Sequence, residues 1–355
     1  MMEMEVKLED VCERGTSNLK QSDIVEIDGD YPIYGASGYI GNVDFYHQEN
    51  PYVAVVKDGA GIGRTTLHPA KSSVIGTMQY LIPKENVIPE YLYYVVSYMH
   101  LEKYFTGATI PHIYYKDYKN EKFNLDPLDR QKTIVDTLGK CEAVIKARKR
   151  ELELMDILIK ARFVEMFGDP VSNSNGLPES TLPELGEFGR GISKHRPRND
   201  PKLLGGDYPL IQTGDVANAG LYITSYSSTY SELGLKQSKM WDNGTLCITI
   251  AANIAKTSIL KFDACFPDSI VGFNANEKTN NIFIHYWFSF FQAILESQAP
   301  ESAQKNINLK TLSELKVIVP VKDKQDKFVE FIKQVDKSKV AVQKALDETQ
   351  MLFDT

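Results

Sequence analysis

The sequence lacks the features of a secreted, disulfide-bonded or membrane-spanning protein. Its cysteines are scattered, without the paired spacing of a zinc site or a disulfide framework. No window holds the roughly 18 consecutive apolar residues that a membrane span requires. The first nine residues are too acidic, and their apolar run too short, for a signal peptide. We therefore expect a cytoplasmic protein. The four cysteines are Cys12, Cys141, Cys247 and Cys265.

Positive charge is also in deficit. The 355 residues carry a net charge of −7, whereas a protein that binds nucleic acid normally presents a basic face to the phosphates. The basic residues are unevenly distributed, however. Residues 190–202 hold five basic side chains against one acid, Asp200, and residues 140–162 hold seven basic ones. The acidic total weakens a DNA-binding interpretation without excluding it.

Intact catalytic and cofactor motifs are missing as well. Asn50-Pro51-Tyr52 resembles the Asn-Pro-Pro-Tyr turn of amino-methyltransferases, but the second proline is absent. Residues 59–65 look like a phosphate cradle, yet Arg64 stands where a P-loop needs lysine and where a dinucleotide fingerprint needs its third glycine. The histidines have no metal-ligand spacing. We expect no catalytic residues, no metal site and no cofactor in this chain.

What the chain does contain is an internal repeat at a shift of 194 residues. Residues 129–132 correspond to residues 323–326, and each segment opens a long helical pattern. Steps of four and three residues trace a heptad track in the first helix, and the same shift carries this track onto the second. A shared register favours two equivalent helices packed as an antiparallel pair. The first track is Ile134, Leu138, Cys141, Ile145, Arg148, Leu152, Met155, Ile159, Arg162 and Met166. The second is Ile332, Val335, Lys339, Val342, Leu346, Thr349 and Phe353.

Three charged residues, Arg148, Arg162 and Lys339, interrupt these apolar tracks. A charge at a seam position costs stability but can fix the register and the choice of partner. Alternatively, these side chains could face a further partner protein. Both alternatives stay open at the level of the sequence.

The segments before the two helices repeat too. Each half holds β-branched runs bounded by turn residues, which are typical of strands, and one buried helix, at residues 89–104 or 282–297. The shifts vary between matched segments, as loop insertions would cause. The matched pairs are Ile113 with Ile307, Phe123 with Val317, residues 56–65 with 248–257, and residues 73–76 with 269–272.

These patterns predict an α+β fold: two globular domains separated by two long helices that form an antiparallel coiled-coil pair, in an internal two-fold repeat. A chain of 355 residues with 43% hydrophobic content is long enough for two such cores. The predicted parts are a first domain at residues 1–125, a central spacer helix at 126–168, a second domain at 169–320 and a C-terminal spacer helix at 321–355.

The doubled arrangement resembles the specificity subunit of type I restriction-modification systems over essentially the whole chain. In that family, proline, proline, leucine, any residue, glutamate and glutamine precede an apolar helix. Arg130 and Lys324 stand where the family has glutamate, which is a departure from the pattern. The order of these motifs, found twice, carries the resemblance. The residues that follow the pattern are Pro127, Leu128, Gln131, Pro320 and Gln325.

The resemblance implies a non-catalytic DNA sequence-specificity subunit. Each domain would be a target-recognition domain that reads one half of a bipartite, asymmetric site in double-stranded DNA. The helices would act as a ruler, about 55 Å long for residues 131–167. Two modification subunits, which methylate adenine N6 with S-adenosylmethionine, would dock on the helices, and ATP-driven restriction subunits would join them. The alternative is a scaffold that binds only protein, assembled through the helix pair, which the acidic composition favours slightly.

Eight residues are candidates for DNA contact. Four of them lie in a basic loop of the second half, and the others flank a turn of small residues that both halves share. Arginine and asparagine can read base edges bidentately, whereas lysine mainly contacts phosphate. The small residues of the turn suit either tight packing or close approach to a DNA groove, and both remain open. The candidates are Lys57, Arg64, Lys194, His195, Arg196, Arg198, Asn253 and Lys256.

Overall fold

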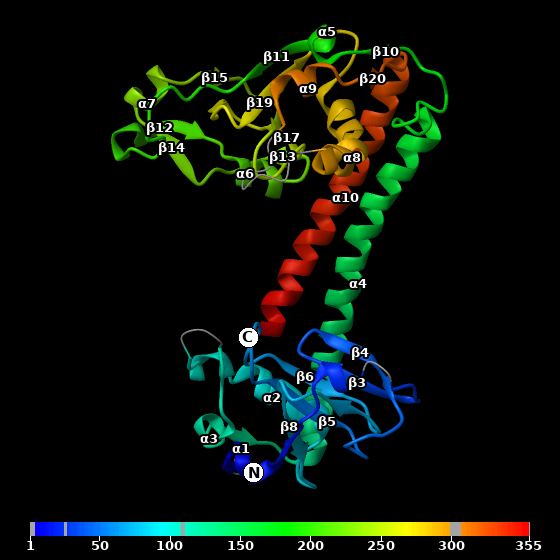
Figure 1. Ribbon diagram of the computed structural model, residues 1–355, viewed down its shortest axis with the longest axis vertical. Helices are drawn as coiled ribbons and strands as arrows, with labels where there is room; N and C mark the ends of the chain where they lie inside the picture. The colour runs from blue at the N-terminus through cyan, green and yellow to red at the C-terminus, as the bar shows by residue number, and fades with distance from the viewer. Residues whose placement is uncertain (1–3, 25–26, 108–110, 299–306, 355) are drawn as a thin grey trace. The chain divides into compact units, whose positions relative to one another are not determined.

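The computed structural model describes residues 4–24, 27–107, 111–298 and 307–354. It divides into a first unit, residues 1–146 with 349–355, and a second unit, residues 147–348 (Figure 1). The first unit contains β1 (Met4–Lys7), α1 (Leu8–Val11), β2 (Cys12–Thr16), η1 (Gln21–Ile24), β3 (Tyr31–Gly35), β4 (Gly38–Val43), β5 (Tyr52–Val56), β6 (Thr65–His68), β7 (Ser73–Val74), β8 (Met78–Pro83), α2 (Pro89–Tyr98), η2 (Leu101–Tyr104), α3 (Tyr115–Tyr118), β9 (Lys122–Leu125) and the start of α4 (Leu128–Phe167).

The second unit follows the same plan with more elements. It contains β10 (Glu179–Ser180), α5 (Leu182–Leu185), β11 (Gly186–Arg190), η3 (Pro201–Leu203), β12 (Leu204–Leu210), α6 (Thr213–Asn218), β13 (Tyr222–Ile223), β14 (Ser228–Tyr230), α7 (Glu232–Lys236), β15 (Met240–Trp241), β16 (Leu246–Thr249), β17 (Thr257–Leu260), β18 (Ala264–Cys265), β19 (Ile270–Ala275), α8 (Asn281–Gln298), α9 (Leu309–Ser313), β20 (Val317–Ile318) and most of α10 (Lys322–Asp354). None of the helices within the described ranges is long and apolar enough to cross a membrane.

A buried strand lies at the centre of each unit. β5 belongs to a four-stranded antiparallel sheet of order β2-β8-β5-β6, and β16 to a five-stranded sheet of order β11-β19-β16-β17-β13. Every residue of both strands is buried, because successive side chains point to opposite faces of a sheet and each face meets a core. In the first unit, Val53 and Val55 pack with Leu92 of α2, while Tyr52 and Ala54 pack with strands of the smaller sheet β4-β3-β7.

Strand registers show that the two units are copies of one plan. β1 pairs with β9 through Glu5 and Asn124, and β10 pairs with β20 through Glu179 and Ile318. The partners in β9 and β20 therefore stand 194 residues apart, the shift found in the sequence. In the larger sheets, Val55 lies opposite Gln79 as Ile248 lies opposite Val271. The predicted repeat is confirmed at the level of individual strand pairs.

Two details predicted from the sequence are wrong. Ser73 of β7 pairs in parallel with Ile33 of β3, and its structural counterpart is Cys265, which pairs in parallel with Leu210 of β12. The match of residues 73–76 with 269–272 is therefore displaced by four residues. The helix expected at residues 89–104 ends at Tyr98, because His100 adopts a left-handed conformation (φ 50°) that an α-helix cannot accommodate.

The two long helices form the predicted antiparallel pair. Every position of the two predicted heptad tracks is buried or half-buried. Their direction follows from contacts inside the second unit. The ring of Phe163, near the end of α4, lies 5.4 Å from that of Phe328 at the start of α10, whereas Asp156, earlier in α4, pairs with Lys339 further along α10. The α+β fold with an antiparallel helix pair is confirmed.

The charged residues of the seam find partners within the chain. Lys339 pairs with Asp156 across the two helices, and the guanidinium of Arg162 lies over the ring of Phe331, 5.9 Å from its centre. Both contacts join α4 to α10, so they support the register alternative. Arg148 instead pairs with Glu151 one turn away in its own helix, at 2.7 Å.

A buried glutamine ties the first turn of each long helix to its own unit. The side-chain amide of Gln131 donates to the carbonyls of Asn86 (2.9 Å) and Asp126 (2.8 Å), and its oxygen accepts from the backbone N–H of Ile88 (3.0 Å). Gln325 repeats this arrangement in the second unit (Lys278 at 3.0 Å, Pro320 at 2.8 Å, and the Thr279 hydroxyl at 2.9 Å). Neither glutamine is accessible to solvent. The glutamine of the sequence pattern is therefore a structural anchor.

Replacing this anchor should destabilise the second unit. Gln325→Ala leaves the Pro320 carbonyl and the Thr279 hydroxyl buried, and the Lys278 carbonyl partly buried, without their partner. Each buried group costs ~1–3 kcal/mol, so we expect the free energy of unfolding to fall by roughly 3 kcal/mol. The Gln325→Met variant, which keeps the volume of the side chain, should lose almost as much free energy of unfolding. Urea denaturation followed by circular dichroism measures both, and the exposed Gln334→Ala on the same helix is the control. A loss seen with alanine but not with methionine would assign the effect to a cavity instead.

Candidate DNA interface

The glycine-rich segment of the first unit is a tight turn between β5 and β6. The backbone N–H of Val56 donates to the carbonyl of Arg64 (2.9 Å), and that of Gly63 donates back to Val56 (2.8 Å). Gly59, Gly61 and Gly63 all have φ near +80°, a conformation that glycine adopts at no steric cost. The glycines therefore serve the path of the backbone, and a phosphate cradle is not needed to explain them.

The same turn in the second unit is one residue shorter. The backbone N–H of Thr249 donates to the carbonyl of Lys256 (2.9 Å), and that of Ala255 donates to Thr249 (2.8 Å). Thr249 thus takes the place of Val56, and the sequence alignment at a shift of 192 is wrong by one residue on the first strand. Ala255 keeps the left-handed backbone at φ 56°, which costs an L-residue about 1–2 kcal/mol. The turn geometry is maintained even where glycine has been lost.

Tight packing explains one glycine of the turn, whereas the others leave room for close approach of a DNA groove. A Cβ on Gly63 would lie 2.5 Å from the backbone nitrogen of Glu102, so tight packing explains this glycine. A Cβ on Gly59 would meet nothing within 4 Å, and the atoms nearest to one on Gly61 would be those of the Arg64 guanidinium, the end of a flexible side chain. The outer part of the turn is therefore open on the side where a ligand could approach.

The structure places Lys57 and Arg64 at the two ends of this turn. Arg64 is exposed, and its guanidinium donates to the carbonyl of Ala36 at the tip of the β3–β4 hairpin. Lys57 is half-buried, and its carbonyl accepts a hydrogen bond from Ile113 (3.0 Å). Asn253 and Lys256 occupy the equivalent turn of the second unit, where Asn253 is exposed and Lys256 is half-buried. These four candidates thus lie on two equivalent turns.

The remaining candidates lie in the loop between β11 and η3, which a distant acid holds in place. Arg198 forms an ion pair with Asp268 at 2.5 Å, and Arg196 approaches the other carboxylate oxygen at 3.4 Å. Asp268 precedes Ser269, whose carbonyl accepts from the backbone N–H of Ile250 (3.0 Å) at the base of the second turn. The connection between β18 and β19 therefore brings the basic loop and the turn with Asn253 together.

His195 is engaged within its own loop. Its ring lies 3.1 Å from a carboxylate oxygen of Asp200, and its backbone N–H donates to the side chain of Gln237 (3.0 Å). The backbone N–H of Lys202 and the His195 ring both hold the pKa of Asp200 below its ordinary value, so this carboxylate stays charged near neutral pH. Lys194 has no ion-pair partner in the part of the chain that the structure describes, and it is exposed.

Sequence reasoning missed Asp268 and Gln237. Asp268 lies about 70 positions along the chain from the arginines that it holds, in a connection of two short strands. Gln237 follows a five-residue helix, α7, and no motif marks it. Because ion pairs and hydrogen bonds depend on proximity in space, neither residue had a signal in the sequence that could have revealed it.

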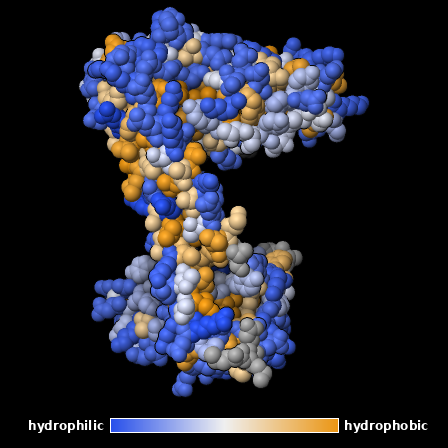
Figure 2. Space-filling view, turned by 180° about the vertical axis from the view of Figure 1, so that it is seen from behind, coloured by the Kyte–Doolittle hydropathy of each residue, from blue (hydrophilic) through white to orange (hydrophobic). Residues whose placement is uncertain are grey.

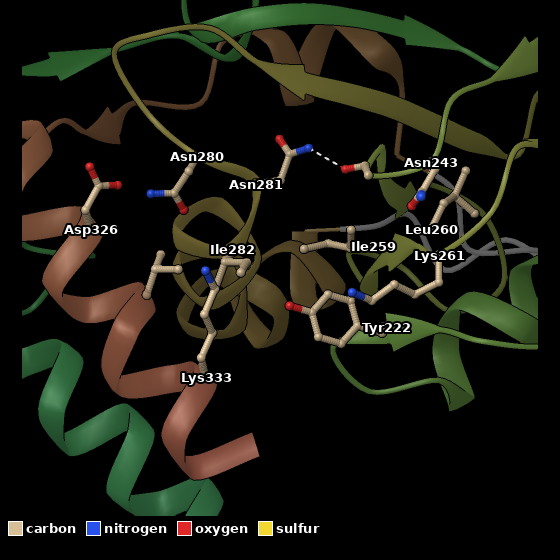
Figure 3. Close-up of a pocket in the computed structure, with 12 residues that line it drawn as sticks. Tyr222, Asn243, Ile259, Leu260, Lys261, Asn280, Asn281, Ile282, Asp326 and Lys333 are labelled. Carbon is tan, nitrogen blue, oxygen red and sulfur yellow. Dashed lines mark hydrogen bonds between the residues drawn. The ribbon is translucent and has the colours of Figure 1, made fainter. Parts of the chain in front are cut away.

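A cavity of about 310 Å³ lies elsewhere in the second unit (Figure 3). The amine of Lys261 sits 3.8 Å from the centre of the Tyr222 ring, and the side chain of Asn281 donates to the carbonyl of Gly244 (2.6 Å). Asp326 is the one acid in the lining and is paired with Lys322 at 2.5 Å. The two lysines of the lining, Lys261 and Lys333, form no ion pair with Asp326. Throughout the described ranges, no group of three or more metal-ligating side chains comes together.

Comparisons with known proteins agree with the resemblance drawn from the sequence. Residues 2–154 and 179–349 match the family described as the type I restriction modification DNA specificity domain. A putative type I restriction enzyme MjaX specificity subunit from Methanocaldococcus jannaschii is 22% identical over 297 residues, which cover 78% of this chain and 68% of that protein. The match in two copies favours DNA specificity over the alternative of a scaffold that binds only protein.

Solved structures support the same fold. The S subunit of a type I restriction-modification system from M. genitalium has a TM-score of 0.62 and 15% identity, over 99% of this chain and 94% of its own. A chain from a structure of the assembly and conformational transition of the type I R-M system has a TM-score of 0.58 and 15% identity, over 99% of this chain and 95% of its own. At such low identity the likeness establishes the fold alone.

The two glycines of the first turn should differ in their tolerance of alanine. Both Gly59→Ala and Gly63→Ala place an L-residue at positive φ, at a cost of about 1–2 kcal/mol. Gly63→Ala also drives a Cβ against the backbone of Glu102, so its free energy of unfolding should fall by at least ~1 kcal/mol more. Chemical denaturation of the two variants tests this, and equal losses would contradict the packing assigned to Gly63.

Proposed function

Because this chain belongs to the family of type I restriction-modification DNA specificity domains, we propose that each unit reads one half of a bipartite, asymmetric DNA site. The observation that carries this proposal is a duplicated scaffold with different loops. The strand registers match pair by pair, whereas the second unit adds β13 to its sheet and carries α6 and α7 in its connections. Different loops on one scaffold read different half-sites, so the target is not a palindrome.

The DNA contacts are assigned to the turns and the loop described above. Arginine and asparagine side chains there face base edges, and the lysines neutralise phosphates. Arg64 is supported by its anchorage on the β3–β4 hairpin. Arg196 and Arg198 are supported by their pairing with Asp268, whose neighbour Ser269 holds the base of the turn that contains Asn253. The proposed contact residues are Lys57, Arg64, Lys194, His195, Arg196, Arg198, Asn253 and Lys256.

The helices are proposed to set the unread spacer between the half-sites. α4 has 40 residues and therefore a length of about 60 Å at ~1.5 Å per residue, more than one ~34 Å turn of the duplex. In this proposal residues 1–125 and 169–320 are the target-recognition domains. Residues 126–168 and 321–355 form the spacer.

The helices are also proposed to dock two modification subunits, through an apolar stripe on the part of α4 in the second unit. Leu154, Ile157 and Leu158 lie outside the seam, and each is about half exposed (48%, 55% and 50%). Figure 2 shows apolar surface along this part of the helix. At a shift of 194, Met351 and Leu352 of α10 take the places of Ile157 and Leu158 and are 69% and 74% exposed. Two equivalent apolar pairs suit two copies of one partner.

This chain would contribute recognition, and its partners the chemistry. The modification subunits would transfer the methyl group from S-adenosylmethionine to adenine, and the restriction subunits would add translocation and cleavage. The complex would work in the cytoplasm, where it meets DNA.

Mapping DNA methylation in cells with and without this chain tests the proposed function. We expect one split adenine motif with two unlike halves to lose its methylation when the gene is deleted, and to regain it when the gene is restored. Persistence of every split motif after deletion would overturn the proposal. Loss of a palindromic motif would overturn its asymmetric form.

The docking stripe can be tested on the same complex. Ile157→Ser with Leu158→Ser removes apolar area that contributes ~25 cal/mol per Å² when buried, so we expect weaker assembly with the modification subunit and an unchanged unfolding midpoint. Analytical ultracentrifugation of the mixed subunits measures assembly. Val340→Ser is the control, since Val340 is 65% exposed on α10 and its counterpart at a shift of −194 is Lys146. If the double variant and the Val340→Ser control assemble equally well, the stripe is not a docking surface.

A further inference from the structure

Two arginines of the basic loop in the second unit share a single carboxylate. Arg198 and Arg196 meet the two oxygens of Asp268 at 2.5 Å and 3.4 Å. Asp268 is about one-third exposed, and both arginines are about half exposed. This cluster therefore lies at the surface, where the two guanidinium groups retain access to solvent and to a ligand.

An acid at this place opposes attraction to DNA. The loop carries four cations, Lys194, Arg196, Arg198 and Lys202, and two acids, Asp200 and Asp268, lie in or against it. Each acid weakens the attraction of the loop to phosphates, which grows with the number of phosphates neutralised. A loop that only bound the phosphates of DNA would bind DNA more tightly if Asp268 were absent. The presence of Asp268 instead suits a loop whose arginines must be held in one orientation.

The two arginines use their donors differently. Arg196 turns back on its own loop, where its Nη1 donates to the carbonyls of Ser193 (2.6 Å) and His195 (2.9 Å). Arg198 contacts Asp268 through Nη2, and no other ion pair of this side chain occurs within the described ranges. A guanidinium has five N–H donors in a fixed fork, so Arg198 retains a whole edge for a base, whereas Arg196 has both terminal nitrogens engaged and can offer DNA only its remaining donors.

The lysines of the loop differ from the arginines in that no described residue holds their side chains in an ion pair. Lys194 and Lys202 form no ion pair with any side chain in the parts of the protein that the structure describes. A lysine that is not held can follow a phosphate, whereas bidentate contact with the O6 and N7 atoms of guanine requires an oriented arginine. Arg198, which is paired with Asp268, thus suits contact with a base, and Lys194 and Lys202, unpaired among the described residues, suit contact with phosphates.

We propose that Asp268 is the positioning residue of this loop: it holds Arg198 in the orientation that discriminates bases in the half-site read by the second unit, at the expense of attraction to phosphates. This inference rests on the proposed function. It assigns base discrimination at that half-site to a residue that lies about 70 positions from the basic loop and is itself an acid.

Two opposite changes are expected from one substitution. Asp268→Asn keeps the shape of the side chain and removes its charge. Discrimination among bases in the half-site of the second unit should fall by about tenfold, the factor that corresponds to ~1.4 kcal/mol and lies within the range for one bidentate pair. Binding to unrelated DNA should become tighter, with a steeper salt dependence. The other half-site should keep its discrimination.

The experiment uses the full chain assembled with its modification subunits. Methylation of DNA libraries randomised in one half-site at a time measures discrimination, and titration of unrelated DNA at several salt concentrations measures the charge effect. Asp242→Asn is the matched control, because Asp242 is an exposed acid of the same unit and forms no ion pair with the described residues. Arg198→Lys keeps the charge but loses the fork, so it should relax the same half-site without tightening the binding of unrelated DNA.

The outcomes separate this inference from the proposed function. A wild-type complex that methylates no split site defeats the proposed function. With wild-type activity intact, Asp268→Asn defeats the inference if it keeps full discrimination, relaxes both half-sites equally or behaves as Asp242→Asn does. An unfolding midpoint measured for each variant identifies a general loss of folding, in which case the Arg198→Lys libraries decide: an unchanged half-site then overturns the inference.

Discussion

The buried glutamine at the start of each long helix is the constraint on which the rest of the structure depends. The segment just before each long helix and the loop before α2 or α8 both present groups that need hydrogen-bond partners. A primary amide is both donor and acceptor, so each glutamine donates to carbonyls of both segments and accepts from the loop before α2 or α8. A glutamate would lack the donor and a lysine the acceptor. Each long helix is thereby fixed to the core of its own unit before the heptad seam adds its contacts.

Once the helix starts are fixed, the scaffold and the loops can change independently. The central strands β5 and β16 are buried on both faces, and a substitution there disturbs a close-packed core. The turns and the basic loop lie at the surface, where residues can be exchanged without that cost. The result is one scaffold used twice, with a glycine-rich turn in the first unit and a shorter turn beside an arginine loop in the second. This is the arrangement that a subunit with two unlike half-sites requires.

The acidic composition is compatible with DNA as the ligand because charge acts locally. Many basic residues of the long helices pair within a turn of their own helix, such as Lys140 with Asp136 and Arg150 with Glu153, and exposed pairs of this kind contribute little to stability. The basic loop keeps cations at the surface even after Asp200 and Asp268 are counted. A net charge of −7 therefore describes the whole chain and not the surface that would face the duplex.

The sequence by itself determined the repeat, the long helices with their seam, the α+β class and the family, because periodicity and order survive in a linear pattern. Only the tertiary structure decided the rest. It showed that Gln131 and Gln325 are anchors, that Gly63 serves packing, that the turn of the second unit is one residue shorter, and that His100 ends a helix. It also brought Asp268 to Arg198 and Lys339 to Asp156. Ion pairs and close contacts join residues that are distant along the chain, and their energies depend on separation in space, which a linear sequence does not encode.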